Sequence, residues 1–115
     1  MTTKNAKEIL RMIARESAMP LAQIQSPTRQ RETVFVRQRC AAVLREIGLS
    51  YRLIGELIDR DESTVLRLVK KAHIRYGSDP EYFSRLAYRL TDLLAGGDGI
   101  DSPGVDRYGK RGIEQ

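Results

Sequence analysis

The sequence predicts an all-α protein with about five helices. Apolar residues recur at spacings of three and four in several stretches, and no stretch alternates apolar and polar residues as a half-buried strand would. Residues that favour helix ends, chiefly Ser, Asp, Gly and Pro, separate these stretches. The length of 115 residues suits one domain. We expect that domain to cover residues 1–95, followed by a flexible Gly-rich tail at 96–115.

The first predicted helix lies in KEILRMIARESA, and Pro20 interrupts the pattern after it. Its apolar face at helical spacing consists of Ile9, Leu10, Ile13 and Ala14. A short apolar piece, LAQI, follows the proline. The next segment, SPTRQRET at 26–33, contains Ser-Pro, two arginines and little apolar content, so we expect a loop there.

The helical pattern resumes at about Val34 and runs through VRQRCAAVLREI to Gly48. Glycine is favoured just past a helix because it tolerates positive φ. One face of this helix carries Cys40, Ala41, Leu44 and Ile47. Cys40 is therefore predicted to be a small buried residue and not a reactive thiol.

Two further helices follow, joined by a tight turn at Asp59 and Arg60. Ser50 is a good N-cap for YRLIGELI, and Asp61 can cap ESTVLRLVKKAHIRY by accepting a hydrogen bond from a backbone N–H one turn on. The inward face of the second helix has Val65, Leu68, Val69 and Ala72. Its outward face has Glu62, Ser63, Thr64, Arg67, Lys70 and Lys71.

The last predicted helix lies in EYFSRLAYRLTDLL. Gly77 ends the preceding helix, and Asp79 followed by Pro80 supplies a cap and a first helical residue. The apolar stripe consists of Phe83, Leu86, Ala87, Leu90 and Leu94.

Catalysis is not expected, because the residues that it needs are missing. The sequence has no GxxxxGK[ST] or HExxH motif, and one Cys with one His cannot build a structural zinc site from those residue types. Paired acids at Asp59, Asp61 and Glu62 could do general acid-base work, but a turn and a helix cap are their simpler role. We expect no catalytic residue, cofactor, metal or small-molecule substrate.

A membrane location is not expected either. No apolar run approaches the ~20 residues of a membrane span, and the N-terminus interrupts its apolar residues with charges, unlike a secretory signal peptide. We expect the protein in the cytoplasm.

Positive charge is concentrated in the central third of the chain. Residues 29–76 hold eleven Arg or Lys and six acids, which equals the whole net charge of +5. Clustered cations raise the potential that phosphates feel, so this segment is the predicted anion-facing surface, although a solvated charged face has the same composition. Two helices joined by a tight turn, with Ser-Thr opening the second and cations beyond, have the pattern of a helix-turn-helix.

The run IGELIDRDESTV resembles the signature of the C-terminal DNA-binding domain of DnaA, the bacterial replication initiator. In that family an Ile-Gly pair precedes Arg-Asp-His-[Ser/Thr]-Thr-Val. Upstream, ILRMIARESAMPLAQIQSPTRQRETVFVRQRCAAVLRE resembles its long first helix, short apolar piece, basic loop and second helix opening with Arg-Gln. Downstream, VLRLVKKAHIRYGSDPEYFSRLAYRLTDLL resembles its recognition helix and last helix. The resemblance covers residues 6–94.

The resemblance implies a Trp-repressor-like helix-turn-helix bundle that binds duplex DNA as a monomeric unit. It implies a minor-groove arginine from the basic loop, best matched by Arg31 with Arg29 nearby, and phosphate or base contacts at Arg37 and Gln38. Major-groove contacts map onto Asp61, Glu62, Ser63 and Thr64, and basic positions further along that helix map onto Arg67, Lys70 and Lys71. Arg52 and Arg60 complete the predicted DNA-binding residues.

Two departures from the family affect the expected function. Glu62 stands where the family has His, so a donor is replaced by an anion that can accept from cytosine N4, and we expect a changed base preference. Secondly, this chain carries no AAA+ ATPase segment.

We therefore expect a stand-alone, sequence-specific, nucleoid-associated regulator of transcription or replication that acts by occupying a site. The alternatives are an oligomeric DNA-packaging subunit of the phage small-terminase kind and a protein-interaction module whose cations meet an acidic partner. The sequence leaves the oligomeric state open.

Overall fold

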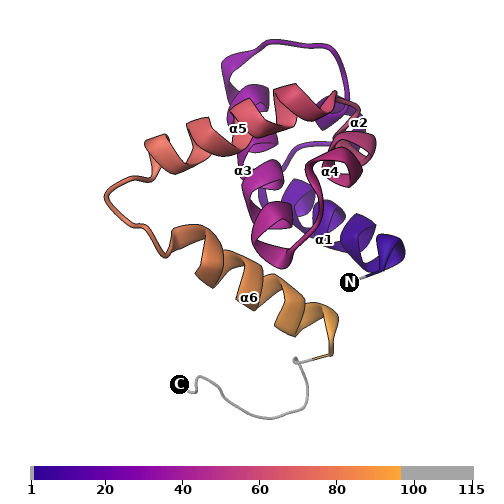
Figure 1. Ribbon diagram of the computed structural model, residues 1–115. Helices are drawn as coiled ribbons and strands as arrows, with labels where there is room; N and C mark the ends of the chain where they lie inside the picture. The colour runs from indigo at the N-terminus through magenta and orange to yellow at the C-terminus, as the bar shows by residue number, and fades with distance from the viewer. Residues whose placement is uncertain (1, 97–115) are drawn as a thin grey trace.

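The computed structural model describes residues 2–96, and this part of the chain contains six α-helices and no strand (Figure 1). The all-α prediction is confirmed. The helix beyond the predicted five is a single turn formed by LAQI. In chain order the helices are α1 (Thr3–Glu16), α2 (Leu21–Ile24), α3 (Arg31–Ile47), α4 (Tyr51–Ile58), α5 (Glu62–Arg75) and α6 (Tyr82–Leu94). The tail predicted at 96–115 lies, apart from Gly96, outside the described residues.

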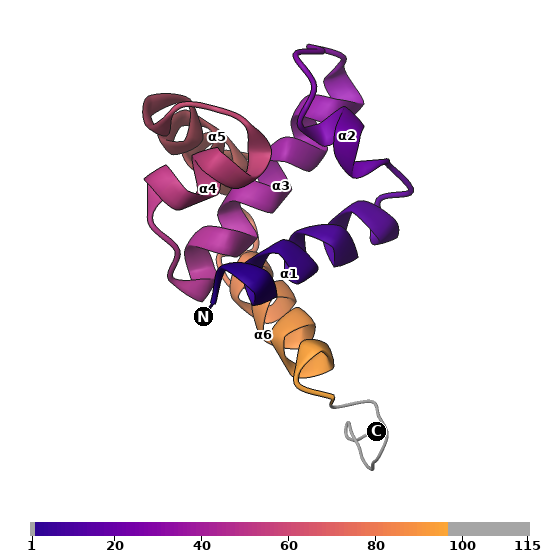
Figure 2. The ribbon, with the colours of Figure 1, turned by 90° about the vertical axis from the view of Figure 1, so that its right-hand side faces the viewer.

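Helix α3 is the centre of the fold, because it packs against each of the other five helices. Figure 2 shows it passing between α1 and the α4–α5 pair. Its middle is a run of small and branched residues with no exposed surface: Cys40, Ala41, Ala42, Val43 and Leu44. The small side chains let neighbouring backbones approach closely, and dense packing of this kind stabilises the native state. The predicted inward faces of α1, α4, α5 and α6 line the same core.

The N-terminus of α3 lies earlier than predicted. The helix begins at Arg31 and not at about Val34, so Arg31 belongs to the first helical turn and not to the loop. Residues 31–33 show no apolar period, but buried Thr33 accepts a hydrogen bond from the Gln23 amide at 2.8 Å. Glu32 also suits the positive end of the helix dipole.

Three predicted helix boundaries are confirmed by local hydrogen bonds or backbone angles. The Ser50 hydroxyl accepts from the Leu53 N–H at 3.1 Å, and the Asp61 carboxylate accepts from the Thr64 N–H at 3.0 Å. Gly48 follows α3 with a φ of 109°. The start of α6 differs as the start of α3 does, because Pro80 lies in a turn and the helix begins at Tyr82.

Gly55 allows the turn between α4 and α5 to fold back onto α4. A Cβ atom added to Gly55 would lie 2.3 Å from the backbone carbonyl oxygen of Arg60, a distance that no ordinary contact allows. The Arg60 N–H also donates to the Gly55 carbonyl at 2.9 Å. The turn therefore requires glycine at this position, because any side chain would push its backbone away.

No helix of residues 2–96 is both long and apolar enough to cross a membrane.

Replacing Gly55 with alanine tests this close approach. We expect Gly55→Ala to lower the free energy of unfolding by about 1–3 kcal/mol, because the added methyl group overpacks the turn. Urea unfolding followed by circular dichroism measures it. The exposed neighbour Glu56 provides the control, and Glu56→Ala should stay within about 0.5 kcal/mol of wild type. Equal stability of wild type and Gly55→Ala would contradict the assigned role.

Cys40 provides a second test of the packing, because it is the single cysteine of the chain. Burial raises the pKa of its thiol to about 12, and the side chain has no exposed surface. At pH 8 the folded protein should therefore resist alkylation by iodoacetamide, while the urea-unfolded chain reacts as an ordinary thiol does. Mass spectrometry of timed samples measures both rates. Comparable rates in the two states would show that the α3 core is open.

Candidate nucleic-acid interface

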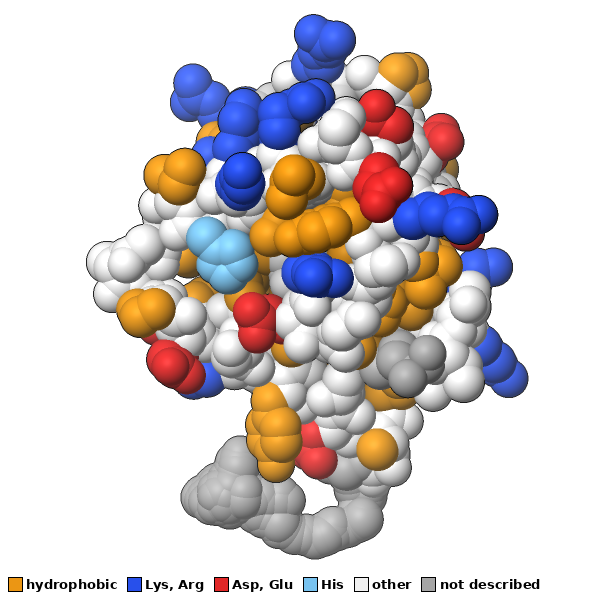
Figure 3. All heavy atoms as spheres, viewed as in Figure 1, with side chains coloured by type: hydrophobic (Ala, Val, Ile, Leu, Met, Phe, Trp, Pro, Cys, Tyr) orange, Lys and Arg blue, Asp and Glu red, His pale blue; other side chains and the backbone are white. Residues whose placement is uncertain are grey.

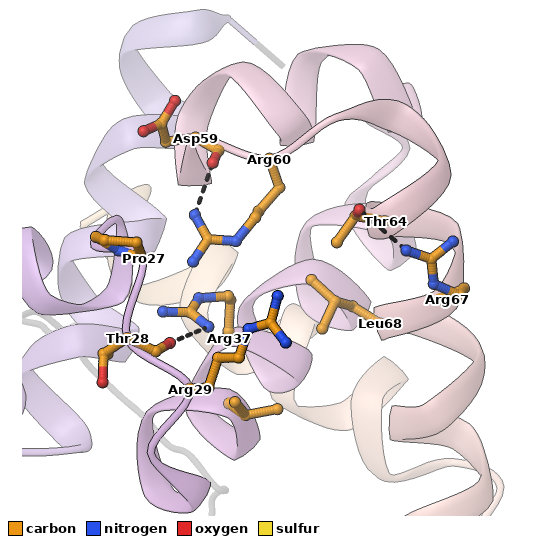
Figure 4. Close-up of a pocket in the computed structure, with 10 residues that line it drawn as sticks. Pro27, Thr28, Arg29, Arg37, Asp59, Arg60, Thr64, Arg67 and Leu68 are labelled. Carbon is orange, nitrogen blue, oxygen red and sulfur yellow. Dashed lines mark hydrogen bonds between the residues drawn. The ribbon is translucent and has the colours of Figure 1, made fainter.

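A groove lies between the loop before α3 and the N-terminal half of α5, with a volume of about 720 Å³ (Figure 4). Four arginines line it, contributed by the loop, α3, the α4–α5 turn and α5. The lining residues are Pro27, Thr28, Arg29, Val34, Arg37, Asp59, Arg60, Thr64, Arg67 and Leu68. These four elements thus place cations around one concave surface, which is suited to an anion.

Arg37 holds the loop in place from the interior. It is 4% exposed, and its guanidinium donates to three backbone carbonyls: Nε to Ile24 at 2.8 Å, Nη2 to Ser26 at 3.0 Å and Nη1 to Thr28 at 3.2 Å. The planar fork of arginine suits such a set of acceptors. The family resemblance predicts a contact between Arg37 and a DNA phosphate or base. The structure instead commits its donors to the loop, so its described role is to shape the groove.

Arg60 joins the α4–α5 turn to the same loop. Its guanidinium donates to the Asp59 carbonyl at 2.7 Å and also to the Ser26 carbonyl, which therefore accepts from both Arg60 and Arg37. Burial lowers the pKa of Arg37, and the nearby charge of Arg60 lowers it further. The fold thus holds two like charges close together at the groove, where a bound anion would relieve their repulsion.

The N-terminus of α5 forms a compact hydrogen-bonded unit. The Asp61 carboxylate accepts from the Thr64 N–H at 3.0 Å and from the Ser63 hydroxyl at 3.2 Å, and the Thr64 hydroxyl accepts from Arg67 at 3.2 Å. Hydrogen bonds from Thr64, and to a smaller extent from Ser63, hold the pKa of the Asp61 carboxyl below its usual value. This end of the helix is therefore ordered before any ligand arrives, with Glu62 beside it.

The exposed cations gather on one side of the molecule. Figure 3 shows blue side chains over the region where Figure 1 places α5 and the loop before α3, with red side chains beside them toward the start of α5. The exposed predicted site residues in or directly beside these elements are Arg29, Arg31, Asp61, Glu62, Ser63, Arg67, Lys70 and Lys71. The structure thus brings the loop and recognition-helix residues to adjoining surfaces.

Gln38 and Arg52 do not line the groove. Gln38 is 4% exposed and accepts a hydrogen bond from Arg75, near the far end of α5, at 3.4 Å. Gln38 is thus buried within the described fold, with its amide oxygen engaged by α5. Arg52 is exposed on α4, and its Nε lies 3.7 Å from the Glu56 Oε2. It lines a second hollow of about 490 Å³ on the other side of Arg60, together with Gly55, Glu56, Asp59, Arg60, Asp61 and Glu62.

The structure also adds residues that the sequence analysis did not select. Thr28 and Pro27 line the groove, and Thr28 supplies a carbonyl to Arg37 and accepts from the Gln30 N–H through its hydroxyl at 3.3 Å. Their position directly before Arg29 was the available signal. Within residues 2–96, no group of three or more His, Cys, Asp or Glu is placed to hold a metal ion.

A family model described as the bacterial dnaA protein helix-turn-helix matches residues 6–72. This chain belongs to that family. The match includes every residue that lines the groove and ends within α5, so α6 lies beyond it. No curated protein and no solved structure matches the chain.

Membership of the dnaA helix-turn-helix family supports a DNA-binding role. The two helices of the motif are α4 and α5, and α5 is the one whose N-terminal residues such motifs direct at base edges. The α4–α5 turn requires a glycine at position 55, because the Arg60 carbonyl lies where a side chain would begin.

Because Arg37 holds the loop through three hydrogen bonds, the stability of the protein should depend strongly on its guanidinium. We expect Arg37→Lys to lower the free energy of unfolding by about 2–4 kcal/mol, because an ammonium cannot satisfy all three carbonyls and leaves acceptors without partners. Urea unfolding measures the loss. Arg31→Lys makes the same chemical change at an exposed site and should be nearly neutral. If the two variants were equally stable, Arg37 would not hold the loop.

Proposed function

We propose that the protein is a sequence-specific duplex DNA-binding regulator that acts by occupying its site. The observation that carries this proposal is the groove, whose four arginines adjoin the exposed N-terminal half of α5 in a dnaA-type helix-turn-helix. The function is non-enzymatic binding, exerted on the nucleoid in the cytoplasm. We favour regulation of transcription over regulation of replication, because a protein that occupies its site prevents other proteins from binding that DNA.

The proposed docking places α5 in the major groove. A helix of 14 residues is about 21 Å long and fits a groove about 12 Å wide. Its N-terminal residues Ser63 and Thr64 and the side chain of Arg67 then approach base edges. Because the loop is tied to the α4–α5 turn through Ser26, its position follows that of α5. Arg29 and Arg31 then reach the neighbouring minor groove from the loop and the start of α3.

The remaining cations contact DNA phosphates and neutralise their charge. Lys70 and Lys71 lie further along α5, Arg52 lies on α4, and Arg60 lies in the turn between the two helices. Contacts of this kind position a protein on DNA without reading sequence. Arg37 and Gln38 contribute through the groove that they support.

Selection of binding sites from random duplex DNA tests the proposal directly. We expect enrichment of a defined sequence, and affinity for it should fall steeply with salt, as for other proteins that release counterions from phosphates. Failure to enrich any duplex, with binding equal on all sequences, would contradict sequence-specific recognition.

Variants then separate the two kinds of contact on the selected site. Lys70→Ala and Lys71→Ala should each lower the slope of log affinity against log salt by about 1, while Arg67→Ala should change the preferred sequence. Lys4→Ala provides a matched control, since it removes an exposed cation of α1. Equal salt slopes for wild type, Lys70→Ala and Lys71→Ala would place the phosphate-contacting surface elsewhere.

A further inference from the structure

We propose that Glu62 selects a cytosine in the major groove of the site that α5 binds. This inference rests on the proposed function, because it names one base pair of the site that α5 reads. It concerns the identity of a base, whereas the proposed function requires only that some sequence be preferred.

Glu62 is the free acceptor at the N-terminus of α5. Its neighbours are already engaged with one another, since Asp61 accepts from Thr64 and Ser63, and the Thr64 hydroxyl accepts from Arg67. Glu62 is exposed and makes no hydrogen bond or ion pair with any residue of the described range 2–96. A carboxylate in this condition can approach a donor on DNA without first breaking a contact of the fold.

The surrounding charge keeps Glu62 away from phosphates and close to bases. The arginine-lined groove and the hollow that contains Glu62 lie on two sides of Arg60, which lines both. Phosphates favour the groove, because Asp59 lines both surfaces but the acids Glu56 and Asp61 line the hollow alone. The start of α5 carries the positive end of a helix dipole, which offsets the cost of bringing a carboxylate near DNA. The favourable partner for Glu62 is therefore a donor on a base edge.

The donor pattern of the major groove then selects the base. A carboxylate only accepts, and the donors that face it are the amino groups of cytosine N4 and adenine N6. Guanine and thymine present acceptors that repel an anion. Adenine places its N7 acceptor beside N6, so a second carboxylate oxygen would meet another lone pair. Cytosine is therefore preferred, by roughly 5- to 150-fold over the other bases at that position.

Single base-pair substitution across the selected site tests the inference with two variants and a control. At one position wild type should prefer cytosine. Glu62→Gln should prefer adenine there, because a carboxamide both accepts from N6 and donates to N7. Glu62→Ala should lose the preference at that position alone and keep it elsewhere. Glu56→Gln removes an exposed acid from the same hollow and should leave every preference unchanged.

The outcomes separate this inference from the proposed function. If wild type, Glu62→Gln and Glu62→Ala prefer the same base at every position while binding remains sequence-specific, the inference is overturned and the proposed function stands. A change of preference at one position, from cytosine to adenine, supports the inference. If no duplex is preferred at all, both are overturned. Thermal unfolding of each variant should match wild type, because Glu62 makes no contact that holds the fold.

Discussion

The shared carbonyl of Ser26 is the contact on which the site depends. It accepts from Arg37, which reaches it from within the core helix α3, and from Arg60, which reaches it from the α4–α5 turn. A loop of six residues between α2 and α3 would otherwise have few reasons to adopt one conformation. Two charged donors fix its backbone relative to both α3 and the helix-turn-helix. The relative placement of the loop cations and the recognition helix follows from this one oxygen.

Holding two guanidiniums close together is unfavourable in itself, and the rest of the fold compensates for it. Arg37 loses hydration on burial, and its positive charge is repelled by the positive charge of Arg60. The three carbonyl acceptors around Arg37 offset this cost. The result is a positive concave surface whose repulsion a phosphate relieves.

The sequence predicts those features that follow from local rules. Helical periodicity identified the buried faces and Cys40, and side-chain chemistry identified the caps at Ser50 and Asp61, because both depend on residues a few positions apart. The role of Arg37 escaped such reasoning, since a charged residue on a helix is ordinarily exposed and its three acceptors lie 9 to 13 residues earlier in the chain. Gln38 escaped it because its hydrogen-bond partner, Arg75, lies 37 residues later in the chain. The resemblance located the functional surface, and the contacts then divided that surface into residues that shape it and residues left exposed.

This division determines which positions are able to change without loss of the fold. Asp61 caps α5 and holds Ser63, so replacing it would disturb the helix as well as any contact with DNA. Glu62 is the next residue, equally exposed but engaged with nothing in the described chain, so its chemistry is free to vary. A departure from the family pattern is expected where a side chain faces the ligand and supports no other residue. At the start of α5, a cap that the helix needs, Asp61, therefore stands beside an acid, Glu62, that supports no other residue of the described chain.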